Sequence, residues 1–147
     1  MSTASLQDRL DVIEVVNRFG WHTDQHEWDE LSEVLAEDIY CDYSAVFGVE
    51  QSTVARADVL SQWEKLFSHV RTQHIITNHI VDVDDDTATC RAHFHANHVA
   101  EARHGDSQFL LAGSYQFGLA RTDGRWRVAS VVVSPIWSRG NLTILTG

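Results

Sequence analysis

Two ionisable side chains of this 147-residue chain occupy positions where the surrounding pattern expects apolar residues. The apolar residues of 5–26 recur at three- and four-residue steps, as on one face of a helix, and this stripe ends at Asp24. Residues 87–103 alternate with a period of two, and the apolar set of that strand includes His98. A carboxylate and an imidazole that face the interior are candidates for chemistry.

His74 is a third candidate, in a predicted strand from Gln73 to Val83 whose two alternating faces both contain apolar residues. If Asp24 and His74 meet, a hydrogen bond from the carboxylate to one ring nitrogen fixes the tautomer and makes the other nitrogen more basic. Such a pair is a general base that works near neutral pH and accelerates proton transfer by about 10²–10⁴-fold.

Structural interpretations of the same residues stay open at this point. A histidine that faces the interior is often a core residue whose hydrogen bonds are satisfied. Asp24 fits equally the end of its own helix or the cap of the next one. Tyr43, which shares a face of the predicted strand 39–44 with Ile39 and Cys41, fits a core position as well.

Other types of reactive site find little support in the sequence. His93 and His95 share a strand face, but that face is the polar one and His98 lies on the opposite side, so we expect no metal site. The acidic segment 84–86 lacks the glycine and glutamate of a calcium loop. A glycine-rich phosphate loop and a nucleophile elbow are also absent from the sequence, and we expect no cofactor.

Charge and composition exclude several classes of partner. The chain has 11 Lys and Arg against 21 Asp and Glu, a net charge of −10, which argues against nucleic acid and anionic membranes. Cys41 and Cys90 are too few for a disulfide framework. The sequence holds no apolar run long enough for a transmembrane helix and does not begin like a signal peptide, so we expect a cytoplasmic protein.

The order of the periodic segments predicts an α+β fold in which helices precede long strands. Helices are expected at 5–26, 27–36 and 56–70, a short strand at 39–44, and long strands at 73–83, 87–103, 108–121 and 125–137. We expect a cone-shaped, curved antiparallel sheet wrapped over three N-terminal helices and enclosing a pocket. One domain spans 1–147, with a core of 5–137 and an apolar tail of 138–147 that caps the pocket or crosses to a neighbouring subunit.

Four short motifs carry a resemblance that extends over about residues 5–140. They are Asp24-x-x-x-Trp28-Asp29-x-Leu31, Asp42-Tyr43, Thr72-Gln73-His74 and Thr122-Asp123-Gly124-x-Trp126. Together they resemble the SnoaL-like branch of the nuclear-transport-factor-2-like superfamily, which contains scytalone dehydratase and lindane dehydrochlorinase. This resemblance implies a cystatin-like α+β barrel.

The resemblance also implies a role for four residues. Asp24 matches the acid that orients the catalytic histidine, and His74 matches that histidine, the general base. His98 matches a second pocket histidine, and Tyr43 a tyrosine that polarises the substrate carbonyl through water. His98 or Tyr43 would assist the departing hydroxyl or the enolate oxygen.

The sequence departs from the dehydratase pattern at three positions. Thr23 stands where the dehydratase has a tyrosine, and Gly113 and Tyr115 stand where it has serine and asparagine. Substrate recognition therefore differs, and we do not expect scytalone as the substrate. The side chains expected to contact the substrate are Trp21, Phe47, Asn78, Phe94, Tyr115 and Trp137.

We therefore predict a cofactor-independent lyase, of the dehydratase type, that acts on a small hydrophobic carbonyl or polyketide-like compound. A polyketide or terpenoid cyclase, or an isomerase, would use the same residues. The non-catalytic alternatives are a small-molecule-binding or assembly module and the small subunit of a ring-hydroxylating dioxygenase, because one fold serves many functions. We expect a homodimer or homotrimer.

Overall fold

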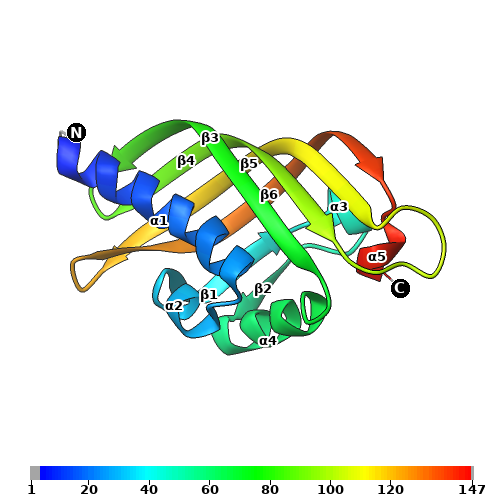
Figure 1. The fold of residues 1–147 in the computed structure, drawn as a ribbon. Helices are drawn as coiled ribbons and strands as arrows, with labels where there is room; N and C mark the ends of the chain where they lie inside the picture. Colours follow the sequence, from blue (N-terminus) through cyan, green and yellow to red (C-terminus); the bar gives the residue numbers. More distant parts are fainter. Residues whose placement is uncertain (1–3, 147) are drawn as a thin grey trace.

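One strongly curved, six-stranded sheet is the frame of the structure, a computed structural model that describes residues 4–146 (Figure 1). Its strands are β1 (Leu35–Asp42), β2 (Ser52–Ala55), β3 (Arg71–Asp84), β4 (Thr87–Val99), β5 (Gln108–Thr122) and β6 (Arg125–Gly140). Their order across the sheet is β2-β1-β6-β5-β4-β3. Within residues 4–146 the two edge strands β2 and β3 do not pair, so the sheet is open and does not close into a barrel.

Five helices complete the fold: α1 (Leu6–Gln25), α2 (Trp28–Glu33), α3 (Ser44–Phe47), α4 (Arg56–Leu66) and α5 (Thr143–Thr146). α1 begins where the Ser5 side chain accepts a hydrogen bond from the Asp8 N–H, at 3.0 Å. It ends at His26, which adopts a left-handed conformation. The helix lies against β3 and buries Val12 and Val16 there (Figure 1).

The α+β class is confirmed, with two differences in detail. β1 and β6 run parallel, whereas all other neighbouring strands are antiparallel as expected. Alternating burial predicts that a segment is a strand but not which strand it joins, and here β6 returns beside the distant β1. The short elements α3, β2 and α5 were not predicted, because four residues are too few to show a period.

A bulge in β3 explains why both faces of this strand contain apolar residues. On one side of it, His74 and Ile76 face inward; on the other side, Val81 is buried and Val83 half-buried. The pairing with β4 slips by one residue in between, at Asn78, whose φ of 59° is in the left-handed region. One extra residue in a strand reverses the face on which all later side chains lie.

The C-terminal segment folds back onto the same chain. Ile144 and Leu145 of α5 are buried, and Leu145 lines the interior cavity described below. α5 lies near α3, at the end of the sheet where the chain terminates (Figure 1). A membrane-spanning helix is not found in the part of the chain that the structure describes.

Candidate active site

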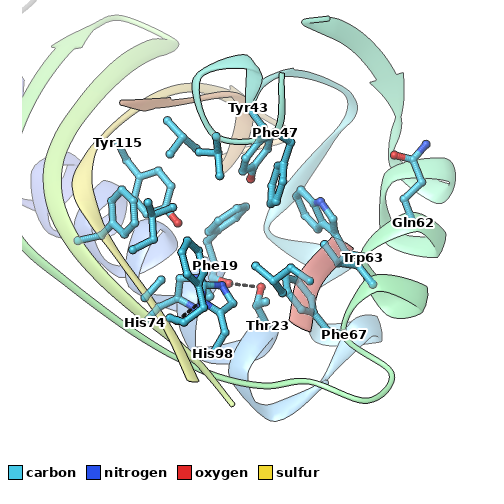
Figure 2. A pocket seen from close by; sticks show the side chains of 18 of the residues that line it. Phe19, Thr23, Tyr43, Phe47, Gln62, Trp63, Phe67, His74, His98 and Tyr115 are labelled. Atoms are coloured by element: carbon cyan, nitrogen blue, oxygen red, sulfur yellow. Dashed lines mark hydrogen bonds between the residues drawn. The ribbon is translucent and has the colours of Figure 1, made fainter. Parts of the chain in front are cut away.

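A cavity of about 220 Å³ lies between the curved sheet and helices α1, α3, α4 and α5 (Figure 2). Much of its wall is aromatic, from Phe19, Phe47, Trp63, Phe67, Phe94 and Phe109. Its polar side chains are Thr23, Tyr43, Gln62, His74, His98 and Tyr115. The described residues of its lining include no Asp, Glu, Lys or Arg, so the cavity suits an uncharged ligand.

Asp24 binds β3 from the last turn of α1. Its Oδ2 accepts the main-chain N–H of His74 at 2.8 Å, and its Oδ1 lies 2.6 Å from His74 Nδ1. The same Oδ1 accepts a hydrogen bond from the Thr72 hydroxyl at 2.8 Å. The carboxylate therefore connects α1 to β3 and does not cap a helix.

A close approach of α1 to β3 makes these bonds possible. Gly20 lies one turn before Asp24 on the same helix face. A Cβ atom at Gly20 would lie 3.0 Å from Ile76 Cδ1 and 3.3 Å from His74 Cβ. The absence of a side chain at Gly20 therefore lets the helix rest directly on the strand that carries His74.

The bond to Asp24 determines which nitrogen of His74 carries the proton. A carboxylate only accepts hydrogen bonds, so Nδ1 is the protonated nitrogen of the neutral ring. Nε2 then keeps its lone pair, on a side chain that is 9% exposed and lines the cavity. This is the protonation state that a general base requires.

His98 lies on β4 with its ring edge-on to that of His74, at 6.3 Å between centroids. Its Nδ1 donates to the main-chain oxygen of Phe109 at 3.0 Å, because a carbonyl can only accept. Burial is the main cause that lowers the pKa of His98, so the ring stays neutral. Its Nε2 therefore carries a lone pair and no proton.

Two tyrosines supply hydroxyl groups to the cavity. Tyr43 comes from the residue before α3, and Tyr115 comes from the middle of β5 (Figure 2). Burial raises the pKa of both phenols well above the usual value, so both hydroxyls stay protonated and can donate.

The structure places seven of the ten predicted site residues around one centre. Tyr43, Phe47, His74, Phe94, His98 and Tyr115 line the cavity, and Asp24 supports it from behind.

The other three predicted residues lie away from this cavity, which corrects the prediction of substrate contact. Trp21 is 62% exposed on α1, next to Gly20, which faces β3. Asn78 sits in the β3 bulge and contacts His93 on the outer face. Trp137 follows a second bulge, at Ile136, which turns its side chain outward.

Thr72 is part of the motif Thr72-Gln73-His74, but the sequence predicted no role for it. It lies two residues before His74 and therefore on the same face of the strand. Its burial and its bond to Asp24 follow from that spacing. A polar residue two positions from a candidate base was the signal available in the sequence.

Comparison with known proteins places the chain in a family. Residues 4–132 match the profile of the SnoaL-like domain. The chain belongs to the SnoaL-like family. A relative from Mycobacterium tuberculosis strain H37Rv, "Uncharacterized protein Rv2910c", is 31% identical over 132 residues, which are 87% of this chain and 85% of that protein.

Solved structures agree with this assignment. The crystal structure of the Kfla4162 protein from Kribbella flavida superposes with a TM-score of 0.91 at 29% identity, covering 96% of this chain and 98% of that one. The hexachlorocyclohexane dehydrochlorinase LinA type 2 gives a TM-score of 0.75 at 15% identity, covering 92% and 90%. The similarity to the dehydrochlorinase structure shows the fold alone. The resemblance to SnoaL-like proteins is thus confirmed.

Proposed function

We propose that this SnoaL-like protein is a cofactor-independent lyase that removes water from a small, uncharged carbonyl compound. The observation that carries the proposal is the hydrogen bond of 2.6 Å between Asp24 and His74 Nδ1. It leaves Nε2 of a buried imidazole as a base in a largely apolar cavity. The name of the structurally similar dehydrochlorinase describes another elimination.

In the first step, His74 Nε2 removes a proton from the carbon next to the substrate carbonyl. The electron pair of that C–H bond moves toward the carbonyl oxygen, which becomes an enolate oxygen. Asp24 stabilises the imidazolium through the same hydrogen bond that oriented the neutral ring. The Tyr43 hydroxyl donates to the oxygen where negative charge develops.

In the second step, the enolate re-forms the carbonyl and expels the hydroxyl from the neighbouring carbon. The departing oxygen takes the proton that His74 gained, and water leaves while the base is restored. His98 cannot supply that proton, because its one N–H bonds to Phe109 and its pKa is lowered. Its Nε2 instead accepts a hydrogen bond from the substrate hydroxyl and orients it.

Proton exchange tests the base before the natural substrate is known. A panel of cyclic β-hydroxy ketones is incubated with the protein in D₂O, and NMR follows deuterium at the α-carbon and any loss of water. We expect exchange with a member of the panel, and a loss of about 10²-fold or more in His74→Ala. The matched control is His104→Ala, at an exposed histidine in the loop between β4 and β5.

Two outcomes separate the proposal from its alternatives. Exchange that depends on His74, with a rearranged product that has lost no water, would indicate a cyclase or an isomerase. Binding of a ketone without exchange above the buffer rate would exclude a base and leave a small-molecule-binding module.

A further inference from the structure

The hydroxyl of Tyr115 has no role in the steps above, yet it lies in the same cavity as Tyr43 (Figure 2). Tyr115 is 5% exposed and comes from β5, whereas Tyr43 precedes α3. The two phenols therefore reach the ligand space from different walls. They also lie near enough for Tyr115 to contribute to the raised pKa of Tyr43.

Aromatic neighbours fix the position of the Tyr115 ring. Phe94 stacks on it with 4.1 Å between ring centroids, Phe117 lies at 5.0 Å, and Phe19 meets it edge-on at 6.5 Å. A ring held on several sides has little freedom to turn. Its hydroxyl therefore points to a defined place in the cavity, as a preorganised donor must.

This hydroxyl has no protein partner among residues 4–146: neither Tyr115 nor Tyr43 makes a side-chain hydrogen bond there. A hydroxyl that opens onto the cavity without a protein partner is free to donate to a ligand, whereas a phenylalanine would pack against the same rings and offer no donor. A ligand that accepts a hydrogen bond accounts for the hydroxyl.

The two histidines, Thr23 and Gln62 do not compete for this role. His74 and His98 present lone pairs, and the Thr23 hydroxyl donates to the main-chain oxygen of Phe19 at 2.7 Å. Gln62 lies at the edge of the group and is directed away from it (Figure 2). The donors that remain for a carbonyl oxygen are the two tyrosine hydroxyls and the indole N–H of Trp63, which lines the cavity from α4.

We propose that Tyr115 is a second catalytic hydrogen-bond donor, which together with Tyr43 binds the carbonyl oxygen of the substrate and stabilises it as an enolate. The inference rests on the proposed function and names the group that receives its negative charge. The inference also specifies which groups the substrate must carry. The substrate presents a carbonyl oxygen to the tyrosines and a C–H bond and hydroxyl to the histidines.

An ionisable phenol tests the donors without the natural substrate. The probe is 4-nitrophenol, whose absorbance distinguishes the bound phenolate from the bound phenol. We expect Tyr115→Phe and Tyr43→Phe each to weaken binding of the phenolate by about 10- to 100-fold, the effect of one charge-assisted hydrogen bond. Tyr40→Phe is the matched control, because Tyr40 is 36% exposed on β1 and does not line the cavity.

Phenylalanine keeps the ring and its stacking on Phe94, so the variants should melt within a few degrees of the parent protein. If Tyr115→Phe binds the phenolate as tightly as Tyr40→Phe does, Tyr115 is not a donor to the oxyanion. If the parent protein does not bind the phenolate, the proposed role of Tyr115 is refuted as well.

The exchange assay distinguishes this failure from failure of the proposed function. Exchange that requires His74 but is unchanged in Tyr115→Phe would leave the base in place and refute the donor. If phenolate binding requires Tyr115 but no ketone exchanges its α-proton, the oxyanion site is supported and the lyase activity is refuted. For a reactive ketone, we expect Tyr115→Phe to lower kcat by about 10²-fold with little change in KM.

Discussion

The carboxylate of Asp24 holds His74 twice, through ring Nδ1 at 2.6 Å and through the main-chain N–H at 2.8 Å. The first bond sets the tautomer and the second fixes the strand relative to helix α1. A base held at both its ring and its backbone is positioned before any ligand arrives. The residues are 50 positions apart in the chain, so only the folded protein has this base.

Replacing the carboxylate of Asp24 by its amide should separate its effect on the His74 tautomer from its effect on the position of the strand. In Asp24→Asn, the amide N–H₂ can donate to His74 Nδ1, which moves the ring proton to Nε2 and removes the base. We expect α-proton exchange to fall by about 10²–10⁴-fold while the fold persists. NMR measures the exchange and circular dichroism the fold. A variant with the parent's rate would show that the tautomer does not matter.

Thr72 should contribute to stability through its bond to the same carboxylate. Thr72→Val removes the hydroxyl donor at 2.8 Å and keeps the shape of the side chain. We expect the free energy of unfolding to fall by about 1–3 kcal/mol in a urea titration. Thr77→Val is the matched control, on the exposed part of β3, and should change it by less than about 0.5 kcal/mol. Equal losses of unfolding free energy in the two variants would show that the bond between Thr72 and Asp24 does not stabilise the fold.

His98 should make the protein less stable as the pH falls. Burial lowers its pKa from the usual 6.5, so the unfolded chain binds this proton at a higher pH than the folded one. The stability due to neutral His98 is complete above about pH 6.5 and is lost between that pH and the lowered pKa.

A non-titrating variant isolates this contribution from that of the half-buried His79, whose pKa is also lowered by burial. Glutamine at position 98 can still donate to the Phe109 oxygen. In urea unfolding between pH 5 and 8, we expect His98→Gln to lose less stability on acidification, by up to about 1.4 kcal/mol per pH unit. Identical slopes would mean that folding does not change the pKa of His98.

Asn141 should control how firmly the C-terminal helix covers the cavity. Its amide donates to the main-chain oxygens of His104 and Asp106, and its oxygen accepts from Thr143 N–H and Oγ. Asn141→Ala removes all four bonds, so Leu145 should leave the cavity wall more often.

We expect faster amide hydrogen exchange over 143–146 and faster release of 4-nitrophenol from this variant. Asn17→Ala is the control, because it removes one surface bond to His79 and lies on α1. Unchanged exchange in Asn141→Ala would show that the packing of α5 alone holds it.

Long periodic segments made part of the site predictable. Asp24 and His98 each lie in a segment with many repeats, so their inward faces could be read from the sequence and are observed. The partnership of Asp24 with His74 required the resemblance as well, because the face of His74 was ambiguous. The substrate, the roles of these residues and the homodimer or homotrimer stay predictions.

Strand bulges account for most of the site positions that the sequence did not predict. The outward turn of Trp137 depends on one extra residue in β6, opposite the step from Ala112 to Gly113 in β5. Such an irregularity depends on the pairing of two strands, and no single segment encodes it. The short α3, which follows Tyr43, left no period to detect.

The bulge at Asn78 has a consequence for changes in chain length. It divides β3 into two halves, in which the inward residues near His74 are even-numbered and those near Val81 are odd-numbered. Deleting the codon for Asn78 would remove the slip without changing any side chain of the cavity. The remaining residues would then pair with β4 one to one, because Thr77 already pairs with His93 and Ile80 with Arg91, so His74 keeps its inward face. A frame-preserving deletion at this one position would thus leave His74 and Asp24 together, although Asn78 lies inside the strand that carries the base.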